Sequence, residues 1–197
     1  MKLERVVLEG RSVRLEPLSP NHHAALCEVS LGCDLFRFFP FPMETPDDMH
    51  RYIEGVLRQH ALGLSLPFVI RERVSGAVAG STSYLAFEPT HRRLEIGATW
   101  LAPQWQRTAL NSEAKLLLLS HAIEHLGMNR VEFKTDARNA RSRAALLRIG
   151  ATEEGTFRAH MVMPDGHLRD SVYYSIVAAE WPAIRLHLEQ RLADGAR

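Results

Sequence analysis

The stretch that most constrains the fold is residues 94–119, which read LEIGATWLAPQWQRTALNSEAKLLLL. Residues 94–101 form an extended run of about the usual strand length, and Pro103 ends the run because proline cannot donate to a ladder. A strongly apolar helix follows, for which Asn111 or Ser112 is a suitable N-cap. The sequence therefore predicts a strand, a short loop and a helix in direct succession.

A loop that runs directly into a helix in this way can bind an anion. The first backbone N–H groups of a helix lack internal partners, and the helix dipole adds partial positive charge there. Phosphate groups bind at such helix ends, so the loop predicts a site for a cofactor that carries a pyrophosphate. The turn itself contains no glycine, which excludes the GxxxxGK[ST] and GxGxxG signatures. An ordinary strand–loop–helix connection remains the alternative.

The chain as a whole has the size and composition of one globular domain. It has 197 residues, of which 46% are hydrophobic and 24% charged, and we treat residues 1–197 as a single domain. Its formal charge of +1 gives no general attraction to nucleic acid or to membranes. The chain has two cysteines, short apolar runs and no N-terminal signal peptide, so we expect a cytoplasmic protein.

Hydrophobic periodicity and turn residues predict the remaining elements. Extended runs predict strands at residues 12–17, 67–72, 77–87, 94–101, 130–135, 151–163 and 168–177. Caps and helical spacing predict helices that follow Ser19-Pro20 and Thr45-Pro46 and that cover residues 112–126, 140–149 and 180–193. Residues 35–43 read as an irregular aromatic segment that either covers the core or forms one wall of a substrate pocket.

The order of these elements decides the fold class. A helix crosses between the fourth and fifth strands, and such a crossover joins parallel neighbours. The rest of the sheet is expected to be antiparallel. We therefore predict an α+β fold whose mixed, mostly antiparallel sheet has about seven strands and is flanked by helices, with the fourth and fifth strands parallel.

Three local stretches occur in an order that is typical of one known family. They are Leu94-Glu95-Ile96-Gly97, residues 103–114 (PQWQRTALNSEA) and residues 139–151 (NARSRAALLRIGA). They resemble, in turn, the fourth strand, the pyrophosphate loop and an N-x-x-S…LGA segment of the GNAT superfamily of N-acetyltransferases. The likeness is greatest to the RimJ/RimL-like branch, which acts on the N-termini of ribosomal proteins.

The resemblance implies a reaction and a set of cofactor contacts. A GNAT enzyme moves an acetyl group from acetyl-CoA to a primary amine by direct attack in a ternary complex, without an acyl-enzyme and without a metal. The cofactor would lie between the fourth and fifth strands, and the backbone N–H near Trp100 or Leu101 would polarise the thioester carbonyl. The implied contacts are Trp100, Leu101, Gln106, Arg107, Thr108, Ala109, Leu110, Asn111, Ser112, Asn139 and Ser142.

Glu95 and Ser142 are the implied catalytic residues. Glu95 is the candidate general base, directly or through a water, and the alternative is an outward residue on a half-solvated strand. Many family members place a tyrosine general acid one helical turn after the serine, but Leu146 stands there and cannot donate. Ser142 would therefore hydrogen-bond the CoA sulfur. Tyr173 and Tyr174 serve either as sheet packing or as reserve donors.

The basicity of amines favours one class of acceptor. A carboxylic acid with the ordinary glutamate pKa of about 4.3 is closer to an α-amine, at about 7.7–8.0, than to a lysine amine at about 10.4. A protein N-terminus or a similarly weakly basic small-molecule amine is therefore the easier acceptor.

The loop departs from the family pattern. Arg107 stands where a glycine is common, and Ala109 and Asn111 occupy the small-residue positions. A guanidinium matches phosphate with two hydrogen bonds, so Arg107 is expected to compensate by binding the pyrophosphate. A second cluster of basic residues comprises Arg138, Arg141, Arg143 and Arg148. These arginines either form a solvated helix face or bind the phosphates of CoA.

Two other functions stay open. His121-Ala122-Ile123-Glu124-His125 spells HxxEH, the inverted zinc-peptidase motif, with two histidines on one helical face, although nothing specifies a third ligand. The degenerate loop and Leu146 favour instead a non-catalytic acyl-CoA-binding or regulatory module, which would bind CoA without turnover. We expect no nucleic-acid partner and no membrane partner, and a homodimer stays open.

Overall fold

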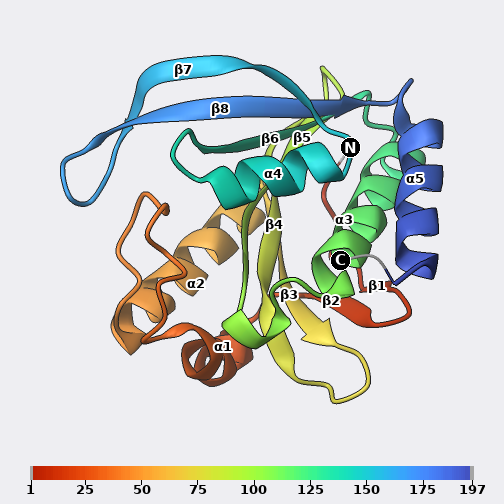
Figure 1. The fold of residues 1–197 in the computed structure, drawn as a ribbon. Coiled ribbons are helices and arrows are strands. Elements are labelled where there is room, and N and C mark those ends of the chain that lie inside the picture. The colour runs from red at the N-terminus through yellow and green to blue at the C-terminus, as the bar shows by residue number, and fades with distance from the viewer. Residues whose placement is uncertain (1, 196–197) are drawn as a thin grey trace.

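The computed structural model describes residues 2–195, which form one eight-stranded sheet flanked by helices (Figure 1). The strands are β1 (Leu8–Glu9), β2 (Val13–Pro17), β3 (Leu66–Glu72), β4 (Val78–Glu88), β5 (Arg93–Leu101), β6 (Arg130–Asp136), β7 (Thr152–Val162) and β8 (Leu168–Val177). The α-helices are α1 (His23–Ser30), α2 (Pro46–Ala61), α3 (Ala109–Ser120), α4 (Ala140–Arg148) and α5 (Trp181–Ala193).

The sheet combines one parallel pair with antiparallel pairs. Its strand order is β1-β2-β3-β4-β5-β6-β8-β7. Within residues 2–195, β5 and β6 pair in parallel and the other neighbours pair antiparallel. The predicted α+β fold is confirmed, and β5 and β6 are the fourth and fifth strands predicted from the sequence. The additional strand, β1, has two residues and is too short to show a periodic pattern.

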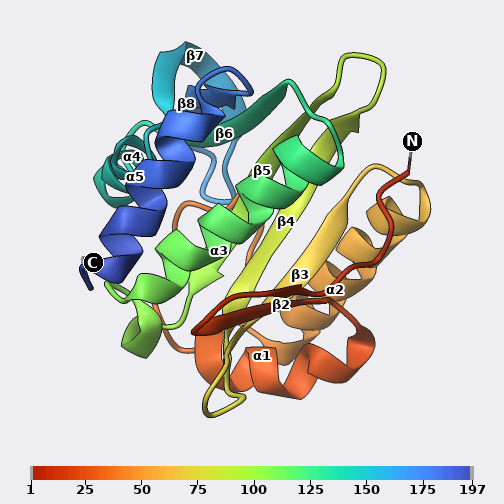
Figure 2. The ribbon, with the colours of Figure 1, turned by 90° about the vertical axis from the view of Figure 1, so that its right-hand side faces the viewer.

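Helices cover the two faces of the sheet in separate layers (Figure 2). On one face, α3 and α5 pack over a core that includes Leu118, Phe133 and Trp181. On the other face, α1 and α2 pack over a second core that includes Met49 and Trp100. Because side chains of a strand alternate between faces, β5 contributes to both layers and lies where they meet.

The helix predicted after Thr45-Pro46 is confirmed as α2. Thr45 Oγ1 accepts from Asp48 N at 3.2 Å, and Asp48 Oδ2 accepts from Thr45 N at 2.9 Å, which is a capping box. The hydrogen bonds from Thr45 and the neighbouring backbone hold the pKa of Asp48 at about 2. The cap fixes the point at which the irregular residues 31–45 end.

The predicted start of the central helix is wrong by a few residues. α3 begins at Ala109 with Thr108 as its N-cap, whereas Asn111 and Ser112 lie inside the helix. Thr108 Oγ1 accepts from Leu110 N at 3.3 Å and also donates to the preceding turn. A single hydroxyl thus serves both the turn and the helix end, so the helix starts before the better-known capping residues.

The C-terminal part of this helix also differs from the prediction. A π-helical turn, His121–His125, follows α3, and Gly127 ends it at a φ of 63°, as expected for a C′ glycine. The predicted buried stripe is only partly correct, because Leu119 is buried while Leu116, Ile123 and Leu126 are half-buried. The fully covered positions next to the sheet are Ala114, Leu118, Leu119 and Ala122.

The predicted C-terminal helix, residues 180–193, is observed as α5, which packs against α3 (Figure 2). Trp181 and Leu188 are its buried residues. No helix within residues 2–195 is both long and apolar enough to cross a membrane.

Candidate active site

β5 and β6 pair over a short distance and then separate. The parallel ladder has three residue pairs, which join Arg93, Leu94 and Glu95 to Arg130, Val131 and Glu132. Beyond them, residues 96–101 and 133–136 pair only outward, with β4 and β8. We call the wedge between these two segments the splay. It gives β5 a free backbone edge to which an extended ligand can add hydrogen bonds.

The free edge of β5 contains a bulge. Ser83 stands opposite Gly97, but Ser81 stands opposite Trp100, so β5 has one extra residue in this interval. Ala98 in the bulge has a φ of 48°, a left-handed conformation that is unfavourable for alanine. Bulges re-aim the backbone and are common beside active sites.

The backbone of Leu101 faces the splay. Ala102 N donates to Ala79 O of β4 at 2.8 Å. Consecutive residues of a strand direct their N–H and C=O groups to opposite edges, so those of Leu101 point away from β4 and into the splay. Consistent with this, Gln106 Nε2 donates to Leu101 O at 2.9 Å. Of the two residues expected to polarise a carbonyl, Leu101 therefore directs its N–H toward the splay and Trp100 directs its own toward β4.

Gln106 holds the loop between β5 and α3 in place. Besides its bond to Leu101, its Oε1 accepts from Arg141 Nη1 of α4 at 2.7 Å. The neighbouring Arg107 is exposed and has a φ of 58°, a conformation that glycine adopts without strain. The loop therefore needs a backbone conformation that suits glycine, and Arg107 adopts it while adding a cation to the loop.

The first turn of α3 presents backbone donors beside this loop. Thr108 Oγ1 accepts from Leu110 N, while the N–H groups of Ala109 and Asn111 have no intrahelical acceptor in a helix that begins at Ala109. Ser112 is buried in the next turn. The predicted cofactor residues 106–112 therefore form one continuous loop and helix end at the mouth of the splay.

On the other side of the splay, β6 leads into α4. Asn139 is the N-cap of α4, and its Oδ1 accepts from Ser142 N at 3.0 Å. The Asn139 amide group keeps two N–H donors for other partners. Ser142 is half-buried in the first turn, and Leu146, one turn later, is buried in the core.

Three arginines of the predicted basic cluster around α4 each contact a different partner. Arg138 pairs with Asp136 at 2.9 Å, Arg141 bonds Gln106, and Arg143 Nε donates to Tyr174 Oη at 3.1 Å. Most of the cluster thus ties α4 and its preceding loop to the sheet and to the loop at residues 106–108.

Glu95 lies at the foot of the splay and is 4% exposed. Its Oε2 is 3.0 Å from Lys134 Nζ, and a Cβ added to Gly97 would stand 2.5 Å from its Oε1. Glycine at residue 97 therefore leaves room for the carboxylate. Glu95 faces away from α3 into a cleft of about 420 Å³ that also includes Arg93, Arg130, Glu132, Lys134, Glu154, Phe157 and Tyr173. The alternative of an outward, solvated Glu95 is wrong.

The two tyrosines of β8 have different surroundings. Tyr173 lines the same cleft as Glu95, and burial raises the pKa of its hydroxyl. Tyr174 is fully buried on the other face, where its hydroxyl donates to Glu153 Oε2 at 2.9 Å. Tyr174 is a packing residue, and Tyr173 is the reserve donor that the geometry leaves available.

Sequence reasoning missed two cations beside Glu95. Lys134 pairs with it, and the alternation of charged residues along β6 was a signal for that face. Arg169 is 5% exposed, its Nη1 donates to Phe38 O at 3.2 Å, and its Nε has no hydrogen-bond partner within the described residues. Burial lowers the pKa of Arg169. No sequence pattern marked this arginine, because its burial depends on residues 31–45 folding over it.

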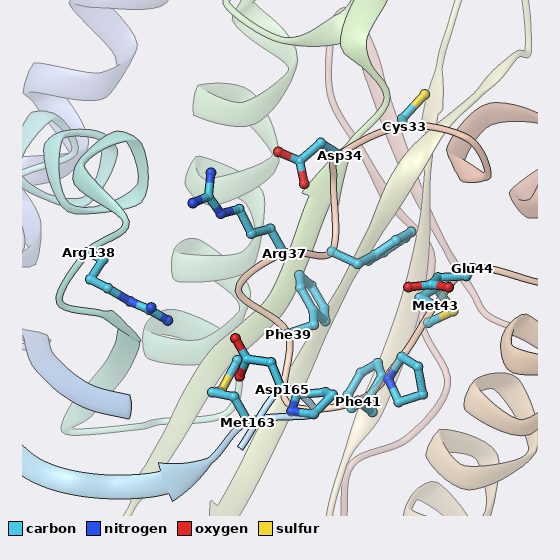
Figure 3. Close-up of a pocket in the computed structure, with 13 residues that line it drawn as sticks. Cys33, Asp34, Arg37, Phe39, Phe41, Met43, Glu44, Arg138, Met163 and Asp165 are labelled. Atoms are coloured by element: carbon cyan, nitrogen blue, oxygen red, sulfur yellow. The ribbon is translucent and has the colours of Figure 1, made fainter. Parts of the chain in front are cut away.

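The aromatic segment forms one wall of a second pocket of about 270 Å³ (Figure 3). Phe39, Phe41 and Met43 stand on one side, and Arg138 reaches in from the other. The turn between β7 and β8 closes the pocket with Met163, Pro164 and Asp165. Phe36 packs edge-on against Trp100 of β5, with ring centroids 5.3 Å apart. The segment therefore covers the core, as one reading predicted, and it also lines a pocket; that this pocket takes a substrate stays a prediction.

The HxxEH motif has structural contacts in this fold. Glu124 Oε1 accepts from Trp181 Nε1 at 2.6 Å and from Arg185 Nη1 at 2.9 Å, which holds α5. The His121 ring stacks on Tyr84 and on His125. Within residues 2–195, no three His, Cys, Asp or Glu side chains are grouped so that they could hold a metal ion.

The family model described as "Acetyltransferase (GNAT) domain" matches residues 12–152. The chain therefore belongs to the GNAT acetyltransferase family. It is also 34% identical over 106 residues to "Putative ribosomal N-acetyltransferase YdaF" of Bacillus subtilis (strain 168), a match that spans 54% of this chain and 57% of that protein.

Solved structures agree with this assignment. A "putative acetyltransferase from T. thermophilus" is 38% identical with a TM-score of 0.88, covering 98% of this chain and 100% of that one. A GCN5-related N-acetyltransferase from Brucella melitensis is 30% identical with a TM-score of 0.89, covering 98% and 87%. Mycobacterium smegmatis RimJ, in complex with CoA-disulfide, is 24% identical with a TM-score of 0.80, covering 97% and 94%, and shares the fold.

Proposed function

We propose that this protein transfers an acetyl group from acetyl-CoA to a primary amine, in a ternary complex and without an acyl-enzyme. The observation that carries the proposal is the splay, whose free β5 edge runs from the buried Glu95 to the loop and helix end at residues 106–112. Membership of the GNAT family supports an acyl-CoA donor.

The cofactor contacts follow from this arrangement. Backbone N–H groups at the start of α3 would bind the pyrophosphate, with Arg107 as an additional cation. The pantetheine arm would extend along the free edge of β5, within reach of the Asn139 amide. The Leu101 N–H would then donate to a carbonyl of the arm or to the thioester carbonyl.

Glu95 would act as the general base. The acceptor amine must be neutral to attack the thioester carbonyl, so a nearby carboxylate has to take its proton. Glu95 faces the cleft opposite α3, and Lys134 would have to yield its place to the incoming amine. Ser142 would hydrogen-bond the CoA sulfur as the C–S bond breaks, and Tyr173 is the reserve donor in the cleft.

A protein N-terminus is the acceptor we favour. The Bacillus subtilis relative is described as a ribosomal N-acetyltransferase, and the cleft around Glu95 is open and lined by charges of both signs. An extended, polar peptide end suits such a cleft better than an apolar small molecule does. A small-molecule amine is the alternative acceptor.

Calorimetry with acetyl-CoA tests the proposal first. We expect a Kd in the micromolar range for the wild type and a loss of about tenfold or more for Arg107→Glu, because that change replaces a phosphate partner with a like charge. Arg158→Glu, on the exposed strand β7, is the matched control and should bind within about twofold of the wild type.

The outcomes separate the candidate functions. Binding followed by turnover of a peptide α-amine supports the proposal. Binding without turnover of any amine would favour the non-catalytic module, to which the buried Leu146 at the usual tyrosine position lends some support. Absence of binding at millimolar acetyl-CoA would contradict both.

A further inference from the structure

Lys115 is a buried cation on α3 to which the mechanism above assigns no part. It is 5% exposed, and its Nζ donates to Thr99 Oγ1 at 2.9 Å. Thr99 Oγ1 in turn lies 2.7 Å from Thr82 Oγ1 of β4. An ammonium group has three N–H donors, and Thr99 accepts one of them.

The ammonium lies across the splay on its α3 side. Thr99 belongs to β5, and Phe133, whose ring centroid is 6.0 Å from Lys115 Nζ, belongs to β6. Both residues follow the last paired positions, Glu95 and Glu132, so they stand where the two strands have already parted. Lys115 therefore forms part of the floor of the wedge.

No carboxylate neutralises this ammonium within residues 2–195. Burial lowers the pKa of Lys115 to about 7, and no charged neighbour contributes to the shift. The titratable groups of the surrounding elements have other partners or lie on the other face of the sheet. They include Glu113 on α3, Tyr84 on β4, Arg93 and Glu95 on β5, Arg130, Glu132, Lys134 and Asp136 on β6, and His121.

An unpaired buried ammonium is unfavourable for the free protein. Removing an ammonium from water without a counter-charge or a full set of hydrogen bonds lowers stability. Thr99 and the Phe133 face offset part of this effect, but two donors remain for a ligand. The splay is where such a ligand would lie.

We propose that Lys115 hydrogen-bonds a carbonyl oxygen of the acyl-thioester arm of the cofactor, from the α3 side of the splay. The inference rests on the proposed function, because it assigns a contact within the same site. Charge-assisted hydrogen bonds are about twice as strong as neutral ones, so this contact adds substantially to the binding of the arm. It adds nothing to the binding of the nucleotide half.

Lys115→Met is the variant that tests the inference, because methionine keeps much of the length and removes the charge and the donors. Calorimetry would compare acetyl-CoA with 3′-phospho-ADP, the nucleotide half of the cofactor without its arm. We expect acetyl-CoA to bind Lys115→Met roughly 10- to 100-fold more weakly, and 3′-phospho-ADP to bind within about twofold of the wild type. Lys2→Met, at an exposed lysine, controls for the loss of one positive charge.

A pH series adds an independent readout. Because only the ammonium form has a charge and three donors, wild-type affinity for acetyl-CoA should fall as the pH rises through about 7. The affinity of Lys115→Met should not show this fall, and 3′-phospho-ADP serves as the reference ligand at each pH.

The results distinguish this inference from the proposed function. If the wild type fails to bind acetyl-CoA, both are overturned. If the wild type binds and Lys115→Met binds equally well, the inference alone is overturned. Equal weakening of acetyl-CoA and 3′-phospho-ADP would also overturn it. A Lys115→Met protein with a lower Tm than the wild type would identify a structural lysine and overturn it as well.

Discussion

Each side of the splay holds one buried charged side chain, and the two differ in whether an opposite charge pairs with them. On the side away from α3, Glu95 is 4% exposed and pairs with Lys134 at 3.0 Å. On the α3 side, Lys115 is 5% exposed and has the Thr99 hydroxyl as its partner, with no carboxylate in the described part of the chain. One side holds a neutralised pair, and the other holds an isolated cation.

On the function proposed above, the two charges have different tasks, one in turnover and one in cofactor binding. In that function, the carboxylate of Glu95 exchanges its half-exposed lysine partner for the incoming amine. An unpaired ammonium keeps free donors for an uncharged ligand. We therefore expect changes on the Glu95 side to alter turnover, and changes on the α3 side to alter cofactor binding and stability.

Glu95→Gln should have the largest effect and should act on turnover. We expect kcat for an amine acceptor to fall by about 10²- to 10⁴-fold, because glutamine cannot take the proton, while the Kd for acetyl-CoA changes by less than about twofold. Steady-state kinetics and calorimetry measure the two quantities.

Glu132→Gln is the matched control for this prediction. Glu132 lines the same cleft, but its carboxylate is already held by two guanidinium groups, since it pairs with Arg130 at 2.9 Å and with Arg93 at 3.4 Å. A comparable loss of kcat in both variants would contradict a specific role of Glu95 in turnover. A large rise in the Kd of Glu95→Gln for acetyl-CoA would contradict the assignment of cofactor binding to the α3 side.

Lys115→Met should raise the stability of the free protein in a pH-dependent way. The pKa of Lys115 is about 7 in the folded state and close to 10.5 when unfolded, so the unfolded chain binds more protons between these values. Wild-type stability should therefore rise across that window relative to the variant. We expect the Tm of Lys115→Met to exceed that of the wild type by several degrees at pH 7 or below, with a difference that shrinks toward pH 10.

Thermal unfolding at several pH values measures this difference. Lys2→Met should show no comparable pH-dependent advantage, since Lys2 is exposed. A constant difference between Lys115→Met and the wild type would mean that packing, rather than the buried charge, is responsible.

Thr108→Ala should have the smallest effect and should appear mainly as lost stability. Removing the N-cap hydroxyl of α3 costs about 1 kcal/mol, or roughly 2–4 °C in Tm for a chain of this size. Thr108→Ser keeps the hydroxyl and should retain most of the stability. If Thr108→Ser is as unstable as Thr108→Ala, the loss of stability comes from the missing methyl group and not from the missing capping hydroxyl.

Much of the fold could be predicted because its signals are local. The Thr45-Pro46 cap, the helical spacing that follows and the turn at Gly166 each depend on a few neighbouring residues. The parallel pairing of β5 and β6 followed from a helix between two strands. The motif containing Glu95 and the loop at residues 106–112 were also contiguous in the sequence, so their proximity needed no knowledge of distant contacts.

The parts of the site that were missed depend on residues far apart in the chain. Asn111 and Ser112 were better capping candidates by residue type, but the turn before α3 uses Thr108. Arg169 is buried because Phe38 folds over it. The bulge at Ala98 appears only when β5 is set against β4.

The sequence by itself determined the order of elements, the mixed sheet and the family to which the chain belongs. It did so because periodicity, caps and contiguous motifs depend on neighbours in the chain. Only the tertiary structure decided which charges are paired. Lys134 meets Glu95, and Lys115 meets Thr99 instead of an acid, because strand register and helix packing bring these groups together across the sheet. The pattern of paired and unpaired charges around the splay comes from that packing.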